Sequence, residues 1–472
     1  MNFFSDKRIV GLFAYLLGLT ITLQAFKFDL FGANVYPWNL FYYPLPFILA
    51  VFGLMRAKKT PVFKNGIYLY IAFVLFFTVV ALSCFVPLMD GAGDAWVFAS
   101  NKGFIKLIFL SFFASALFFS SDRLKTSYFG NFFKGFISAV ILQLVFSIAQ
   151  MILWYANGIN LNRWFFLDVL HVDPGHVWGN FIIYPILRAT GFHWDPAYLA
   201  MWLAIGMIWI YLFWQKGTVK KMFLFASLAI FVATFSRAVF LAFFIIMALS
   251  CFLVFVRKAV NNRLKFKLLI ATPLGIAVLS ISFFVFGNND IFGEIWRERT
   301  NISAEGTQRH ISYFFEGARV ISYFPRFLFG FGYRNSGRGL LENDSTAFAL
   351  PGIDNFVIPW SPESDLVNVY LGMGLAGLFA YSVLFISLFY YIFNLYFKIS
   401  KIKKLIGDND RMKMLKKKII FFSFMCGILL LSGVFYSFID NEWYWLLLFG
   451  VFWCDAELRS FDFGKKTSND KL

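Results

Sequence analysis

Charged side chains are scarce in this sequence. Asp, Glu, Lys and Arg make up 15% of the 472 residues, whereas apolar residues make up 60% and aromatic residues 22%. A soluble globular protein carries roughly a quarter of its residues as charged groups, so this composition leaves too little polar surface for a water-soluble fold. The chain is therefore predicted to be a polytopic membrane protein.

Cysteine and histidine are equally rare, with four residues of each kind. The cysteines lie in or next to apolar runs without paired spacing, which excludes a disulfide framework and a cysteine-based metal site. All four histidines fall in loops that are predicted to lie on the outer side of the membrane. The stretch "HVDPGH" from His171 to His176 offers a His-Asp-His set, but its spacing is not that of a zinc site. We expect no metal ion and no cofactor.

Apolar runs long enough to cross a membrane are abundant. The seventh and eighth of the runs form one apolar stretch that only "SR" at Ser236 and Arg237 interrupts, so its division into two helices rests on its length. The sequence predicts an all-α protein with about twelve transmembrane helices, near residues 9–26, 38–55, 66–86, 103–120, 132–156, 196–214, 222–236, 238–256, 268–286, 366–397, 419–438 and 443–457.

Positive charge is distributed unevenly between the two sides. With both termini inside, the inner segments hold about 30 of the 43 Lys and Arg residues. The net charge of +17 is thus explained by membrane topology rather than by a nucleic-acid partner. The alternative that the basic 398–418 loop binds polyanions stays open. The outer segments contain mostly Arg, which binds carboxylate and phosphate in two places at once. The Arg excess therefore indicates an anionic ligand on the outer face.

The predicted helices divide the chain into six segments. Residues 1–156 form helices one to five, 157–195 a first outer loop, and 196–286 helices six to nine. Residues 287–365 form a large outer loop, in which 306–324 has the spacing of an amphipathic surface helix. Residues 366–457 form helices ten to twelve, and 458–472 an inner tail. We find no internal repeat, which argues against an inverted-repeat transporter.

Arginine next to apolar helices points to a buried or lipid-facing anion site. Arg237 is flanked on both sides by long apolar runs, where an unpaired Arg costs roughly 2.5–3.5 kcal/mol, so it is expected to have a partner or to line a wet cavity. The alternative is an Arg that extends its charged end to the membrane interface. Arg188 stands in a similar place, beside the start of the sixth run.

Five stretches, in order, resemble the motifs of the bacterial O-antigen ligase and O-antigen polymerase superfamily. They are "RATGFHWDPAYLA" (188–200), "TFSRAVFL" (234–241), "GTQR" (306–309), "LFGFGY" (328–333) and "ESDLVNVYLGMGLAG" (363–377). The resemblance covers about residues 185–380. Each motif alone is weak, but their order and the long outer loop between helices nine and ten make the match more specific.

The resemblance implies a metal-independent glycosyltransferase of GT-C-like architecture in the bacterial inner membrane. Its active site would be periplasmic, its termini cytoplasmic, and its substrates undecaprenyl-diphosphate-linked glycans. A polysaccharide chain-length regulator is a candidate partner, and nucleic acid is not. Ligases of the superfamily carry a His–Asn pair where this chain has Glu363 and Ser364. That departure favours the polymerase branch, which extends a glycan on a lipid-linked repeat unit.

The chemistry of this reaction assigns roles to particular residues. A leaving diphosphate needs guanidinium groups, and an acceptor hydroxyl needs a carboxylate or imidazole to orient or deprotonate it. Glu363 is the first candidate for that second role. Asp195 also reads as the N-cap of helix six, with Pro196 at its first turn. The predicted catalytic residues are Glu363, Asp365, Asp195 and His193; the diphosphate-binding residues are Arg188, Arg237, Arg309 and Arg319; and the glycan-binding residues are Arg326, Tyr333, Arg334 and Trp360.

Two other functions remain open from the sequence. A ligase or O-oligosaccharyltransferase of the same superfamily would pass the glycan to a different acceptor. A transporter or flippase for lipid-linked glycans would use the Arg residues to line a route and would make no bond. The middles of the predicted helices carry almost no charge, which favours a site at one membrane level over a route through the bilayer.

Overall fold

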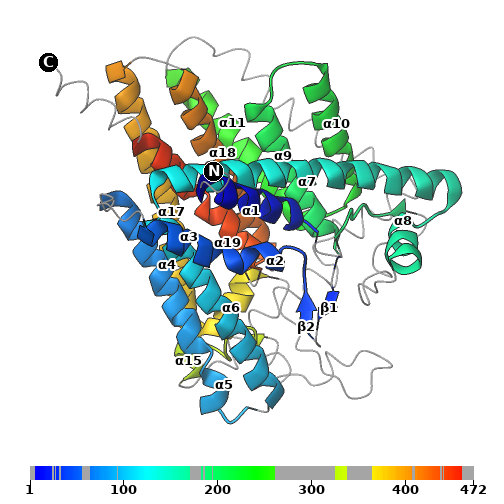
Figure 1. The fold of residues 1–472 in the computed structure, drawn as a ribbon. Coiled ribbons are helices and arrows are strands. Elements are labelled where there is room, and N and C mark those ends of the chain that lie inside the picture. The colour runs from blue at the N-terminus through cyan, green and yellow to red at the C-terminus, as the bar shows by residue number, and fades with distance from the viewer. Residues whose placement is uncertain are drawn as a thin grey trace, which may run out of the picture.

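The protein is described by a computed structural model that is dominated by α-helices (Figure 1). Four strands of two or three residues add two small antiparallel hairpins. The residues that the structure describes are 6–23, 26, 28–30, 33–55, 64–92, 94–170, 182–183, 186–193, 195–260, 325–336, 364–406, 410–435, 438–439 and 441–459.

The helices and strands follow one another in a simple order along the chain. The N-terminal half contains α1 (Asp6–Thr20), β1 (Phe28–Leu30), β2 (Ala33–Val35), α2 (Asn39–Tyr42), α3 (Pro44–Met55), α4 (Lys64–Ser83), α5 (Val86–Met89), α6 (Asp94–Phe119), α7 (Asp122–Asn157), α8 (Leu161–Arg163) and the π-helix η1 (Trp164–Val169). The rest contains β3 (Ile182–Ile183), β4 (Ile186–Leu187), α9 (Pro196–Phe213), α10 (Thr218–Ala233), α11 (Arg237–Val260), α15 (Arg326–Phe329), α17 (Asp365–Ile406), α18 (Asp410–Phe435) and α19 (Glu442–Phe449).

Six described helices are long and apolar enough to cross a membrane, which confirms a multi-pass membrane protein. They match six of the twelve predicted runs. Four more runs contain helices (α1, α2 with α3, α10 and α19) that are shorter than those six, and the run at 238–256 contains α11. The run at 268–286 lies outside the described residues. The six spans are Gly66–Met89, Val97–Phe119, Asp122–Asn157, Pro196–Phe213, Asp365–Ile399 and Asp410–Val434.

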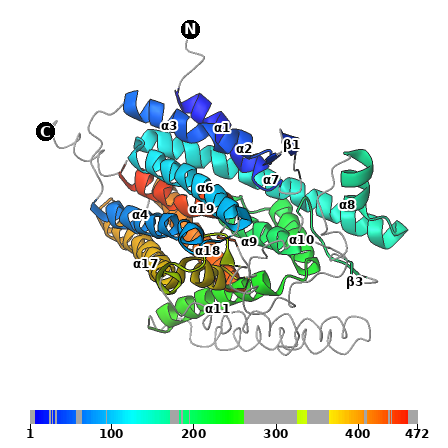
Figure 2. The same cartoon turned by 90° about the horizontal axis from the view of Figure 1, so that it is seen from below.

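Glycine allows α1 and α7 to pack along one another at very close range. A Cβ atom on Gly18 of α1 would overlap the carbonyl oxygen of Phe132, and one on Gly135 of α7 would overlap that of Tyr15. Such close contact increases van der Waals packing where lipid gives no hydrophobic driving force. Seen from below, α1 and α7 lie side by side towards one edge of the bundle and α11 lies at the opposite edge (Figure 2).

Helix α17 is broken near its beginning at Gly374, whose φ of 63° lies in the left-handed region. At the break the carbonyl groups of Leu371 and Gly372 accept hydrogen bonds from the backbone N–H groups of Phe331 and Gly332, at 2.7 and 3.1 Å. Because buried carbonyl groups need partners, above all inside a membrane, the 325–336 segment and α17 satisfy each other. The two segments are one interlocked unit.

The end of the bundle that carries the α6–α7 turn is closed by ion pairs. Arg459 lies 3.0 Å from the Oδ1 atom of Asp122 and 3.1 Å from the Oδ2 atom of Asp455, and Lys418 pairs with Glu457. These contacts join the helical 451–459 segment to the beginning of α7 and to α18. Cys84, Cys426 and Cys454 are buried free thiols, as predicted, while the side chain of Cys251 is outside the described residues.

Candidate functional site

Arg188 leads out of the β3–β4 hairpin into a segment, 188–193, that packs against the end of α10. Its Nε atom donates a hydrogen bond to the carbonyl oxygen of Thr234 at 3.0 Å. The next residue, Ala189, donates from its backbone N–H to the carbonyl oxygen of Ala233 at 2.9 Å. The first two predicted motifs, some forty residues apart in the sequence, are therefore in contact.

The turn that receives Arg188 is the point at which the long apolar stretch divides. Helix α10 ends at Ala233 and α11 begins at Arg237, which confirms the predicted division. Phe235 within the turn has a φ of 49°, a conformation that costs a non-glycine residue free energy and is found most often at functional sites. Arg237 thus begins α11 three residues after Thr234, the residue that Arg188 contacts.

Two buried glutamines of α7 hold the 188–193 segment in place. The Oε1 atom of Gln150 accepts hydrogen bonds from the backbone N–H groups of Thr190 and Gly191, at 3.1 and 3.3 Å. Its Nε2 atom donates to the Thr190 hydroxyl at 3.1 Å. Two helical turns earlier on the same face of α7, the Oε1 atom of Gln143 accepts a hydrogen bond from the backbone N–H of Phe192 at 2.7 Å. The segment is therefore positioned by amides from a neighbouring helix.

Sequence reasoning missed this amide network. Its signal was present, because Gln143 and Gln150 stand seven residues apart, on one face of an otherwise apolar helix. Polar groups in such a helix are costly unless they have a partner in the protein. Gly191 belongs to the same arrangement: its φ is 58°, and a Cβ atom there would overlap the Oε1 atom of Gln143.

Asp195 caps α9, as the sequence predicts. Its Oδ1 atom accepts a hydrogen bond from the backbone N–H of Ala197 at 2.6 Å, and Pro196 occupies the first turn. One of its two carboxylate oxygens is thus engaged in capping the helix. The carboxyl group orients the segment between Arg188 and α9.

His193 is buried between two aromatic rings at the end of the 188–193 segment. Its ring lies 6.2 Å from both Tyr198 and Trp202, nearly parallel to each. Neither ring nitrogen has a hydrogen-bond partner among the described residues. Burial lowers the pKa of His193 to about 3, so the imidazole is neutral at physiological pH. It can accept or donate one hydrogen bond but carries no charge.

Arg326 forms a buried ion pair instead of facing open solvent. Its Nε atom lies 2.6 Å from the Oδ2 atom of Asp90, and both side chains are about 7% exposed. Its guanidinium group also lies 4.6 Å from the centre of the Phe331 ring. This pair fastens α15 to the turn after α5. The residue is among the predicted glycan-binding residues, and its charge is already matched by Asp90.

Tyr333 and Arg334 follow the interlocked glycines and turn towards α6. Gly103 of α6 makes room for them, since a Cβ atom there would lie 2.8 Å from the Tyr333 ring and 3.2 Å from Arg334. Ser100 donates a hydrogen bond to the carbonyl oxygen of Tyr333 at 3.3 Å. Arg334 has a φ of 67°, a second strained non-glycine residue in this region.

Asp365 is fully buried at the beginning of α17. Its Oδ1 atom accepts hydrogen bonds from the backbone N–H groups of Phe438 and Ile439, both at 2.7 Å. Ser364 donates to the carbonyl oxygen of Val434 at 2.7 Å. The two residues join the "ESD" motif to the connection between α18 and α19, so Asp365 acts here as a positioning residue.

The connection between α18 and α19 brings the other parts of the site together, although the sequence did not single it out. Asn441 donates a hydrogen bond to the Tyr198 hydroxyl at 3.3 Å, linking the connection to α9. Glu442, the first residue of α19, forms an ion pair with Lys106 of α6 at 2.7 Å. The indole of Trp445 donates to the carbonyl oxygen of Ile439 at 2.9 Å.

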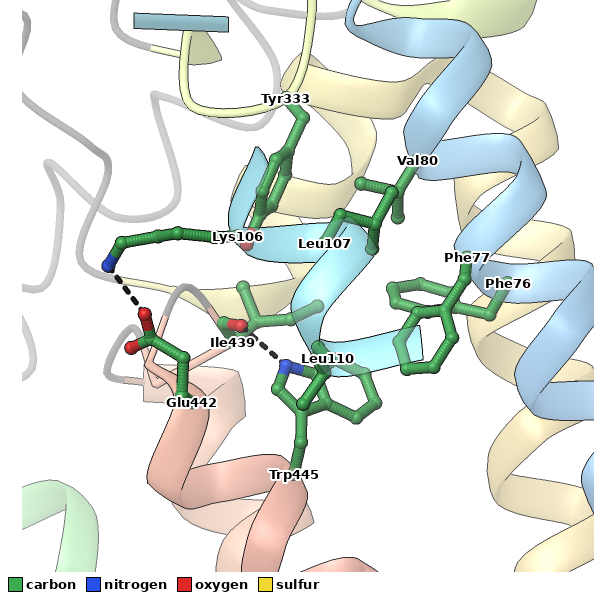
Figure 3. A pocket seen from close by; sticks show the side chains of 10 residues that line it. All are labelled: Phe76, Phe77, Val80, Lys106, Leu107, Leu110, Tyr333, Ile439, Glu442 and Trp445. Carbon is green, nitrogen blue, oxygen red and sulfur yellow. Dashed lines mark hydrogen bonds and ion pairs between the residues drawn. The ribbon is translucent and has the colours of Figure 1, made fainter. Parts of the chain in front are cut away.

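A small cavity lies beside the Lys106–Glu442 pair (Figure 3). Tyr333 lies across it from α19, and the apolar side chains of α4 and α6 form its other walls. The cavity has about 20 Å³ of space for the centres of water molecules, and one water needs roughly 10–15 Å³ by that measure. That space has room for one water molecule or one hydroxyl group and is too small for a sugar ring.

Several predicted site residues lie outside the described residues. Within the part of the chain that the structure describes, no three His, Cys, Asp or Glu side chains are close enough together to bind a metal ion. The predicted residues that lie outside the described part of the chain are Arg309, Arg319, Trp360, Glu363 and the His171, Asp173 and His176 set, together with the side chain of Arg237.

Comparisons with known proteins add no family. The chain matches no protein-family model, and no curated protein is significantly similar to it in sequence.

Proposed function

We propose that this protein is a membrane glycosyltransferase of the O-antigen polymerase type. It transfers a growing glycan from undecaprenyl diphosphate onto a lipid-linked repeat unit, at the periplasmic face of a bacterial inner membrane. The observation that carries the proposal is the contact between Arg188 and Thr234. It brings together the two Arg-containing motifs that flank apolar helices, at the point where α11 begins with Arg237.

Paired guanidinium groups suit a lipid diphosphate for a physical reason. The substrate carries its charge at the membrane surface, on a group anchored by a long apolar chain. Arg residues at helix ends can bind that group in two places each while the chain stays in lipid. Donors that are fixed before the reaction stabilise the charge that develops on the leaving diphosphate. The amide network around Thr190 and Gly191 supplies that rigidity.

The proposed reaction also needs a group that takes up the acceptor proton. Of the carboxylates predicted from the sequence, Asp195 caps α9 and Asp365 holds the backbone of 438–439. Glu363 of the "ESD" motif stays the sequence-based candidate for this role. His193 is neutral and only 1% exposed, so a sugar hydroxyl has no access to it in this conformation.

The direct test is elongation by purified protein in lipid nanodiscs. Incubation with lipid-linked repeat units should give a ladder of products that differ by one repeat unit. Replacing Arg188 with Ala should weaken binding of the lipid diphosphate donor at least tenfold, and Arg188→Lys should restore only part of it, because Lys lacks the two-pronged geometry. The exposed Arg123 on α7, changed to Ala, is a matched control that should leave binding unchanged.

The competing functions predict different products. Transfer only after addition of lipid A core or a protein acceptor would identify a ligase. Movement of the lipid-linked glycan across the bilayer without a new bond would identify a flippase. Absence of any ladder in several lipid compositions, together with donor binding that ignores Arg188, would refute the proposal.

A further inference from the structure

The strongest unassigned feature is the Lys106–Glu442 ion pair with the cavity beside it. Glu442 is 4% exposed, whereas the Lys106 side chain is about a quarter exposed, so the pair reaches the surface through its Lys end. The Glu442 carboxylate therefore stands at the inner end of a short path that starts at the protein surface. Tyr333 lies across the cavity from it (Figure 3).

Aromatic and cationic groups surround the same carboxylate. Tyr36 is stacked on Trp38, with ring centres 5.9 Å apart and planes 15° apart. Burial raises the pKa of Tyr36, the negative charge of Glu442 raises it further, and the positive charge of Arg334 lowers it. The Tyr36 hydroxyl thus lies within electrostatic range of both charged groups. An aromatic ring offers a flat apolar surface on which a sugar ring can pack, and charged side chains form strong hydrogen bonds with hydroxyl groups.

The position of Glu442 links it to the donor side of the site. It follows Asn441, which contacts Tyr198 of α9, and α9 begins directly after the segment that carries Arg188 and His193. On its other side the same connection is held by Asp365 of the "ESD" motif. The connection that carries Glu442 is therefore linked to α9 by one hydrogen bond, and α9 follows the segment of Arg188 directly in the chain.

We propose that Lys106, Glu442 and Tyr333 form the acceptor site, in which Glu442 takes the proton from the acceptor hydroxyl. This inference rests on the proposed function. The hydroxyl oxygen bonds to the anomeric carbon of the donor sugar while the bond from that carbon to the phosphate oxygen breaks. The proton passes to the Glu442 carboxylate, and the electron pair of the broken bond leaves with the lipid diphosphate. The proton then passes to water by way of the exposed end of the pair.

The alternative is that the pair only holds α6 against α19. Removing one partner of a buried ion pair destabilises a protein whatever its function, so a single substitution does not separate the two roles. Exchange of the partners, Lys106→Glu with Glu442→Lys, does separate them. The exchange keeps an ion pair between the helices but moves the carboxylate from the inner end of the path to the outer end.

The experiment compares five proteins in the elongation assay and in thermal unfolding: the wild type, Glu442→Gln, the exchanged pair, Asp410→Asn and Glu363→Gln. Glu442→Gln should lower the elongation rate at saturating acceptor at least 100-fold, within the range for loss of a general base, while donor binding stays within twofold. The exchanged pair should unfold within a few degrees of the wild type and remain as slow as Glu442→Gln. Asp410→Asn removes a carboxylate from an exposed ion pair with Lys413 and should change neither property.

Two results would overturn the inference while leaving the proposed function intact. One is an exchanged pair that regains both stability and rate, which would make the contact purely structural. The other is a Glu442→Gln protein that elongates at the wild-type rate while Glu363→Gln does not, which would return the proton to the "ESD" motif. A wild-type protein that neither binds lipid diphosphate nor elongates would fail the proposed function itself, and the inference with it.

Discussion

Gln150 is the residue whose replacement tests most directly how the site is held together. It is 1% exposed, and its amide oxygen is the acceptor for two buried backbone N–H groups, those of Thr190 and Gly191. Gln150→Leu keeps the size and the helix propensity but removes that acceptor. Each buried N–H left without a partner costs about 1–3 kcal/mol, so the pair costs about 2–6 kcal/mol.

That loss falls on the segment that presents Arg188. The variant should therefore show a lower unfolding temperature in detergent and a dissociation constant for undecaprenyl diphosphate at least tenfold higher, which corresponds to about 1.4 kcal/mol. No arginine has been changed, so the weaker binding would come from positioning alone. Gln150→Glu, which keeps an acceptor oxygen for both N–H groups, should bind the lipid more tightly than Gln150→Leu.

Ile152→Ala serves as the control on the same helix, because Ile152 is 60% exposed. It should leave both the unfolding temperature and lipid binding close to the wild type. If Gln150→Leu unfolds and binds like the wild type, the hydrogen bonds to Thr190 and Gly191 do not position the arginine, and the reasoning is wrong.

Three further predictions follow from the fold. Gly374→Ala should abolish the yield of folded protein, because its Cβ atom would overlap the backbone of Leu328, whereas Gly158→Ala, with a φ of 67° and open space, should cost only about 1–2 kcal/mol in thermal unfolding. The pKa of His193 falls from 6.5 in the unfolded chain to about 3 in the folded protein, so below pH 6.5 the unfolded chain binds a proton that the folded protein does not. Acid therefore lowers the free energy of unfolding, by about 1.4 kcal/mol at pH 5.5 in the wild type, whereas His193→Phe should not lose this amount. Asp90→Asn should cost about 3–5 kcal/mol of stability by taking the carboxylate from buried Arg326, and Asp90→Leu with Arg326→Met should recover most of it.

Helices and their ends were the predictable part of the fold. Apolar length alone predicts the six long spans, because a helix in lipid must satisfy its own backbone whatever packs beside it. The N-cap at Asp195 and the break before Arg237 were also correct, since both depend on a few neighbouring residues. The total of twelve helices depends on runs that are short or interrupted, such as 443–457, which contains Asp455 and Glu457, and composition alone does not decide whether these runs cross the membrane.

The role of the glycines could not be predicted from composition. The glycines of "LFGFGY" can bring the backbone close either to a ligand or to another segment of the chain. In the structure they face the chain itself: a Cβ atom on Gly330 would overlap the backbone around Gly372 of α17, and one on Gly332 would lie 2.8 Å from the Pro87 side chain. Both interpretations use the same property of glycine, and only the partner in space separates them. The same holds for Glu442, whose significance depends on Lys106, more than three hundred residues earlier.

These contacts explain how motifs that are far apart in the sequence are held rigidly in space. The 188–193 segment, the 325–336 segment and the α18–α19 connection have little regular secondary structure of their own. Each is held by groups on a long helix: Gln143 and Gln150 on α7, the freed carbonyl groups of α17, and Asp365 at its beginning. Helices fixed by packing thus impose the positions of short segments that carry charge. A substitution in the supporting amides or glycines should therefore impair ligand binding as much as a substitution of the arginines that would contact the ligand.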